Sequence, residues 1–165
     1  MVNLFIALAL VIIPALAHSE EAALTPLEQT MALRLNWGDE ASEVAYVGSR
    51  CSALYSAVGT YFISNGTTAK DKLDGEDLRT RSNVLGFASV IFGKLSKLEQ
   101  EDTQKRIKVI FTLYLKKMAA SKMLLNNALE TPIAEDLMFC NQHEHNYVKI
   151  MQMYQIELEK SKRKK

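Results

Sequence analysis

Apolar residues recur every three or four positions along most of the chain, the spacing that gathers them on one face of an α-helix. The most regular stretch, from Asp39 to Ser64, carries the stripe Val44, Val47, Cys51, Leu54, Tyr55, Val58, Tyr61 and Phe62. The same spacing predicts further helices over about 76–98, 100–130 and 132–159. A shorter stripe predicts a first helix from Thr25 to about residue 35. The pattern therefore indicates five helical segments.

The stripe over 76–98 is wide and comprises Leu78, Val84, Leu85, Phe87, Ile91, Phe92 and Leu95. Such a wide apolar arc predicts a helix with neighbours on two sides. Gly48 and Gly59 lie inside the preceding helix, where a glycine costs about 1 kcal/mol relative to alanine. We therefore expect these two glycines to mark close contact between helices.

Local signals suggest where the helices begin and where the chain turns. Thr25, followed three residues later by Glu28, has the form of a capping box, and Thr131-Pro132 opens the last helix in a similar way. Residues 65–75 are polar and are predicted to form the longest loop, in which 70–73 could make one helical turn.

The arrangement of these segments predicts the fold class. Only three prolines and seven glycines occur, which favours long helices over many short strands. Long amphipathic helices with short connections predict an all-α, antiparallel up-and-down helical bundle of four long helices. The short N-terminal helix would pack across one end or along a groove. An elongated helical array is the alternative, but no internal repeat supports it.

The N-terminus has the pattern of an export signal. Residues 4–13 are uniformly apolar, Pro14 ends the run, and Ala15-Leu16-Ala17 supplies a cleavage site. The run is shorter than the roughly 20 residues that span a bilayer. Because no Lys or Arg precedes it, an uncleaved anchor is the alternative. We expect a signal peptide at 1–17, a helical bundle domain at 18–159, and a periplasmic or extracellular location.

Two cysteines, Cys51 and Cys140, stand 89 positions apart on the apolar stripes of different predicted helices. Exported chains with an even number of cysteines normally pair them, so we expect a disulfide between these helices. A buried pair of free thiols and an intermolecular bridge are the alternatives. A redox role is not indicated, because no C-x-x-C motif is present.

Two histidines near Cys140 are weak candidates for metal ligands. His143 would share a helix face with Cys140, whereas His145 would point elsewhere. A structural zinc site normally has four ligands, and a disulfide would remove Cys140 from the set. Met31 and His143 are conceivable axial ligands of a haem, by analogy with other helical bundles alone. We expect no metal and no cofactor.

Asn65-Gly66-Thr67 is an N-x-T sequon in the predicted loop. In a eukaryotic secretory pathway Asn65 would be a glycosylation site, and otherwise the tripeptide is a polar turn.

The net charge is +1, but the chain ends in a basic tail over 160–165, which contains Lys160, Lys162, Arg163, Lys164 and Lys165. Such a tail could make weak contact with an anionic membrane surface. The nearly neutral remainder gives no reason to expect nucleic acid as a partner.

No catalytic motif stands out, since G-x-S-x-G, H-E-x-x-H and a glycine-rich phosphate loop are all missing. The acidic pair Glu135 and Asp136 at a helix start is explained by the helix dipole. The leading hypothesis is a non-enzymatic exported bundle that binds an unknown protein partner or supports an assembly. The alternative is a small-molecule or haem-like cofactor carrier, with the ligand near four tyrosines: Tyr55, Tyr114, Tyr147 and Tyr154.

Overall fold

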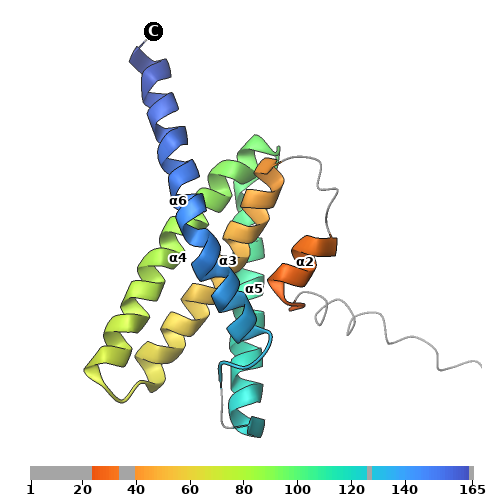
Figure 1. The fold of residues 1–165 in the computed structure, drawn as a ribbon, viewed down its shortest axis with the longest axis vertical. Coiled ribbons are helices and arrows are strands. Elements are labelled where there is room, and N and C mark those ends of the chain that lie inside the picture. Colours follow the sequence, from red (N-terminus) through yellow and green to blue (C-terminus); the bar gives the residue numbers. More distant parts are fainter. Residues whose placement is uncertain (1–23, 34–39, 126–127, 164–165) are drawn as a thin grey trace, which may run out of the picture.

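A computed structural model describes residues 24–33, 40–125 and 128–163 (Figure 1). Its helices are α2 (Leu27–Leu33), α3 (Glu40–Asn65), α4 (Ala69–Leu95), α5 (Gln100–Leu125) and α6 (Ile133–Arg163). The expected all-α bundle of four long helices and a short N-terminal helix is confirmed. The predicted signal peptide and the last two residues of the basic tail lie outside the described residues.

Helix α3 forms the centre of the bundle and contacts α4, α5 and α6 (Figure 1). Between Val44 and Gly59 it is buried on almost every side, with only Tyr46 and Ser56 partly exposed. The predicted apolar stripe is buried from Val44 to Val58 and partly buried beyond it. A helix buried all round needs small side chains between the large ones, which explains the alanines and serines of α3.

Glycines set the close approach of α3 and α4, as the sequence predicted. A Cβ atom on Gly59 would lie 2.6 Å from the carbonyl oxygen of Gly75 in α4. A Cβ atom on Gly48 would lie 2.6 Å from the Oγ of Ser89. Both distances are too short for real side chains, so the two helices meet backbone to backbone at Gly59.

The predicted loop over 65–75 is wrong, because most of it belongs to α4. The helix begins with a capping box in which the Thr68 hydroxyl accepts from the backbone N–H of Asp71 at 3.1 Å. In return the Asp71 carboxylate accepts from the Thr68 N–H at 2.9 Å, which lowers the Asp71 pKa. Gly75, which suggested a loop, lies inside the helix because the contact with α3 requires it.

The last two helices also differ from the predicted ranges. Helix α5 ends at Leu125 rather than near residue 130, and the cis peptide bond of Thr131-Pro132 precedes α6. Helix α6 continues to Arg163, past the expected end at residue 159. Its C-terminal half projects beyond the rest of the bundle (Figure 1). Within the described ranges, no helix combines the length and the apolar character needed to cross a membrane.

The predicted disulfide is confirmed. Cys51 of α3 and Cys140 of α6 are bonded, with their Cα atoms 5.6 Å apart, and each residue is 1% exposed. The bond therefore joins the central helix to the last one inside the core.

Replacing both half-cystines, Cys51→Ala with Cys140→Ala, should lower the free energy of unfolding by about 2–5 kcal/mol. The reason is that the unfolded chain regains the freedom lost by closing an 89-residue loop. Urea denaturation followed by circular dichroism measures the change. Reduced wild-type protein is the control and should lose a similar free energy. An unchanged urea midpoint in both samples would contradict a stabilising role for the bond.

Candidate functional site

Three residues of α6, spaced about one helical turn apart, attach this helix to the rest of the bundle, each by a different kind of interaction. Asp136, Cys140 and Glu144 stand four residues apart, so they lie along one face of the helix. Asp136 forms a buried ion pair, Cys140 forms the disulfide, and Glu144 belongs to a polar cluster. We call these residues the α6 tethers.

The first tether is an ion pair between Asp136 and Arg50 of α3. The Nη2 atom of Arg50 lies 2.5 Å from Oδ2 of Asp136, and the side chains are 1% and 0% exposed. Because burying an unpaired charge is very unfavourable, each residue requires the other. Asp136 therefore does more than favour the helix dipole, the role that the sequence suggested for it.

Asp136 accepts hydrogen bonds from several helices at once. Besides Arg50, its carboxylate accepts from the backbone N–H of Leu27 at 2.5 Å and from the hydroxyl of Tyr114. Leu27 is the first residue of α2, and an N–H group at the start of a helix has no partner within that helix. One carboxylate on α6 thus binds α2, α3 and α5 together.

The Arg50 guanidinium makes further hydrogen bonds besides the ion pair with Asp136. Its Nη2 donates to the carbonyl oxygen of Thr25 at 2.9 Å, and its Nε donates to the hydroxyl of Tyr114 at 3.1 Å. Burial acts to lower the pKa of Arg50, but Tyr114 and Asp136 outweigh it, so the pKa is raised and the charge is kept. The pair is closed to solvent and therefore suits a structural role better than a reaction with a dissolved substrate.

The third tether is a cluster around Arg81 of α4. Its Nε lies 2.8 Å and 3.0 Å from the two carboxylate oxygens of Glu144, and its Nη2 donates to Asn141 at 2.7 Å and to the Tyr55 hydroxyl at 2.9 Å. The hydrogen bond with Glu144 raises the pKa of Arg81. The guanidinium also lies 4.5 Å from the centre of the Tyr55 ring. This cluster joins α3, α4 and α6.

A groove of about 880 Å³ lies between α4 and α5. Its lining residues are Ser52, Ser56, Ser82, Asn83, Gly86, Phe87, Val90, Ile91, Lys94, Leu95, Gln100, Gln104, Ile107, Lys108, Phe111 and Tyr154. Large apolar side chains from both helices form most of the walls, and serines from α3 reach its base. The groove is therefore mostly apolar, with polar groups at a few places.

The groove accounts for the exposure of two apolar residues of the wide arc predicted over 76–98, Phe87 and Leu95. Helix α4 has neighbours on more than one side, as expected, but Phe87 is 56% exposed, Leu95 is 50% exposed and Val84 is 40% exposed, so one edge of the arc is not covered. Helix α4 packs much more extensively on α3 than on α5. The side of α4 that faces α5 is consequently left partly open, and Phe87 and Leu95 line the opening.

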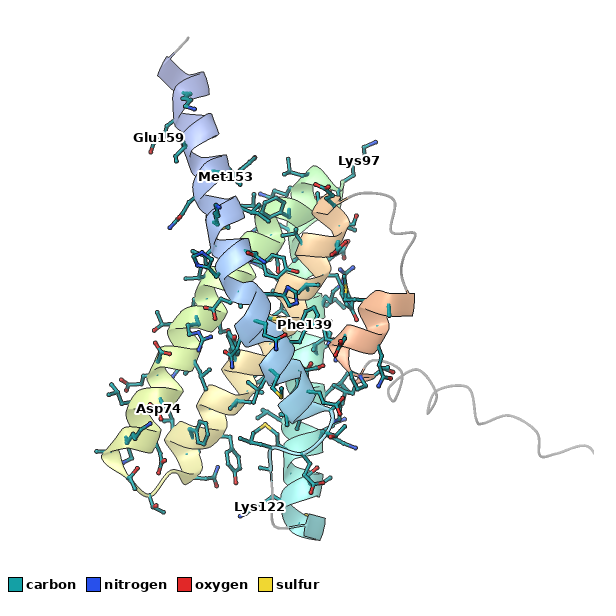
Figure 2. All side chains as sticks on the ribbon, in the orientation of Figure 1. Asp74, Lys97, Lys122, Phe139, Met153 and Glu159 are labelled. Atoms are coloured by element: carbon teal, nitrogen blue, oxygen red, sulfur yellow. A yellow bond between two sulfur atoms is a disulfide. The ribbon has the colours of Figure 1, made fainter. Side chains whose placement is uncertain are left out.

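His143 and His145, the two histidines within the described residues, do not come together with other potential metal ligands. The ring of His143 packs on that of Phe139 with centroids 4.3 Å apart, both half-buried on α6, where Figure 2 labels Phe139, while His145 is exposed. The sulfur of Cys140 is held in the disulfide. Across the described ranges, no group of three or more His, Cys, Asp or Glu side chains is placed to hold a metal ion.

The other predicted site residues are scattered. Asn65 is exposed at the end of α3, where its side-chain amide donates to the carbonyl oxygen of Tyr61 at 3.0 Å. Tyr55 and Tyr114 belong to the polar clusters of the tethers. Tyr154 lines the groove and packs on Phe92 with ring centroids 6.1 Å apart. Of the four tyrosines of the carrier hypothesis, Tyr154 lines the groove and the other three do not.

The chain matches no protein-family model, and neither the curated proteins nor the solved structures include a significant match. Its function is therefore inferred from the geometry of the helices and of the groove.

Removing only one charge of the buried pair should destabilise the fold strongly. Asp136→Asn leaves Arg50 buried without a counterion and should lower the free energy of unfolding by about 3–5 kcal/mol. The double variant Arg50→Met with Asp136→Leu removes both charges and should recover much of that loss. Urea denaturation measures both effects. Glu135→Gln, at the exposed neighbour, is the control, and an equal loss in Asp136→Asn and Glu135→Gln would contradict the assigned role.

Alkaline pH should unfold the protein through its buried tyrosines. Burial raises the pKa of Tyr55, Tyr114 and Tyr147 above the ordinary value of 10.0, with Glu144 adding to the effect at Tyr55. The unfolded chain deprotonates first, so the stabilisation by neutral phenols is complete below pH 10.0 and is lost as the pH rises through the raised values. Tyrosinate absorbance during a pH titration, with circular dichroism in parallel, measures this.

We expect these three phenols to ionise together with the loss of helix as the fold opens. Tyr147→Phe should remove one phenol from this transition. A single phase in which all phenols ionise while the helices remain intact would contradict the assignment.

Proposed function

We propose that the protein is an exported, non-enzymatic binding protein that carries an elongated apolar small molecule in the groove between α4 and α5. The observation that supports this most directly is the groove itself, about 880 Å³ in volume with mostly apolar walls. Its volume lies within the range of about 300–1,000 Å³ that is typical of small-molecule sites.

The exposed side chains of the groove support the same proposal. Phe87 and Leu95 are each at least half exposed in the free protein. Their hydrophobic surface remains in contact with water until something covers it, and each Å² covered contributes about 25 cal/mol to binding. A ligand with a hydrocarbon body would therefore gain binding energy along the whole length of the groove.

The groove is preformed, which favours binding. Helix α4 is held against α3 at Gly48 and Gly59, and Arg81 fixes it to α6. Little ordering of the protein is then needed when a ligand enters, and the entropic cost of binding is correspondingly small.

The polar groups at the base of the groove favour binding over catalysis. Ser52 and Ser82 donate to each other's backbone carbonyl oxygens, at 2.9 Å and 2.7 Å. A hydroxyl engaged in this way is not activated by a neighbouring base, as a catalytic nucleophile would be. The disulfide supports export, because such bonds persist in oxidising compartments.

Protein binding is the second candidate, favoured by the projecting half of α6. Met153 and Ile156 are 51% and 53% exposed there, and Figure 2 shows Met153 beyond the crossing of α6 with the bundle. Glutamate at both positions would abolish binding of a partner to this half of α6. The same substitutions would leave groove binding unchanged, so the two candidates can be separated.

A neutral apolar fluorescent probe, N-phenyl-naphthylamine, should bind the wild-type protein with an increase in its fluorescence. Val90→Trp places a large side chain in the wall of the groove and should weaken binding by about tenfold, a change of about 1.4 kcal/mol. Thr80→Trp lies on the same helix at an exposed position outside the groove and is the matched control.

Circular dichroism should show that both tryptophan variants are folded. Equal affinities for the two variants would contradict the groove as the binding site. Failure of the wild-type protein to bind any apolar probe would contradict the proposed function.

A further inference from the structure

We infer that the ligand is an amphiphile with an anionic head group, of the class of long-chain monocarboxylates, and that Lys108 is its main charged contact. This inference rests on the proposed function and concerns the ligand that the groove would hold. It is carried by the charges along the groove. Lys94 of α4 and Lys108 of α5 line it, and none of its lining residues is acidic.

Both lysines are exposed and available. In the part of the chain that the structure describes, neither makes an ion pair within 4.0 Å, whereas Lys70 of α4 pairs with Asp74. A lysine can lay its methylene stem along an apolar wall and keep its ammonium group at the rim. The groove therefore combines a hydrocarbon surface with unpaired cations, which complements an anion that has an apolar tail.

The surroundings distinguish the two lysines. A small neighbouring hollow contains Lys94 together with Glu99 and Glu101, at the turn between α4 and α5. These carboxylates offset the charge of Lys94 and repel an anion at that end. Lys108 lies about two helical turns further along α5, where acidic residues do not line the groove. The head group is therefore expected beside Lys108, with the tail along the aromatic and aliphatic walls.

Neutral alternatives account less well for this arrangement. The other polar lining residues are serines, glutamines and one asparagine, which can bind a hydroxyl group as readily as a carboxylate. A neutral ligand would give no role to the two cations. A cationic amphiphile would be repelled by both lysines, and no acidic lining residue would attract it.

Three amphiphiles with the same tail test the inference: dodecanoate, dodecanol and dodecylammonium, each kept below its aggregation concentration. Isothermal titration calorimetry with the full mature chain should rank them in that order. Dodecanoate should bind about fivefold more tightly than dodecanol, the gain expected of a partly exposed ion pair. Lys108→Gln should remove that preference, and Lys94→Gln should reduce it less.

Lys105→Gln is the matched control, because Lys105 is exposed on the same helix but does not line the groove. It should leave the preference unchanged. A loss of preference in Lys105→Gln equal to that in Lys108→Gln would overturn the assignment of Lys108. Binding to vesicles that contain an anionic phospholipid is measured in parallel. If the protein binds these vesicles but not dodecanoate, the inference is also overturned.

The outcomes separate this inference from the function on which it rests. Equal binding of dodecanoate and dodecanol would overturn the anionic head group while leaving the apolar groove as a binding site. Failure of all three amphiphiles and of N-phenyl-naphthylamine would overturn both. Chain-length dependence gives an independent check, since each additional buried methylene should strengthen binding by about fourfold.

Discussion

The buried pair of Arg50 and Asp136 is the interaction on which the rest of the structure depends. A charge in the buried middle of a helix is tolerated only when its counterion is equally buried and correctly oriented. The counterion comes from α6, 86 residues further along the chain, and the same carboxylate binds the first turn of α2 and the hydroxyl of Tyr114. Meeting this one requirement brings Cys140 beside Cys51 and places Glu144 within reach of Arg81.

The groove follows from how the long helices share their contacts. Helix α3 is surrounded, and its glycines and serines draw α4 close along one side. The tethers then hold α6 across α3 and α4, while α4 itself packs much less on α5 than on α3. Apolar residues on α4 consequently face a hollow instead of another helix. A site for a ligand thus arises from the packing of the core, without a dedicated loop or motif.

Periodicity in the sequence was sufficient to predict the helices, and the position of each cysteine within an apolar stripe was sufficient to predict the disulfide. The start of α4 was missed because Gly75 and its polar neighbours resemble a loop, although Thr68 and Asp71 have the spacing of a capping box. The ion pair was missed as well. Arg50 interrupts the apolar face of α3, which signals a buried partner, but the spacing of charges along a chain cannot show which helix supplies it. The exposure of Phe87 and Leu95 could not be predicted either. An apolar helix face indicates that the side chains avoid water, but it does not show whether another helix covers them.

The late position of the tethers in the chain has a consequence for the order of folding. Chains begin to fold from their N-terminal parts during synthesis, and α3, α4 and α5 are complete before any of residues 136–144 exists. Until then Arg50 has no counterion and keeps its water, so the centre of α3 cannot be sealed. Closure of the core around Arg50 therefore requires the last helix. The end of the chain thus supplies the group that the centre of the fold needs, so a chain truncated before α6 would lack the counterion of its most buried charge.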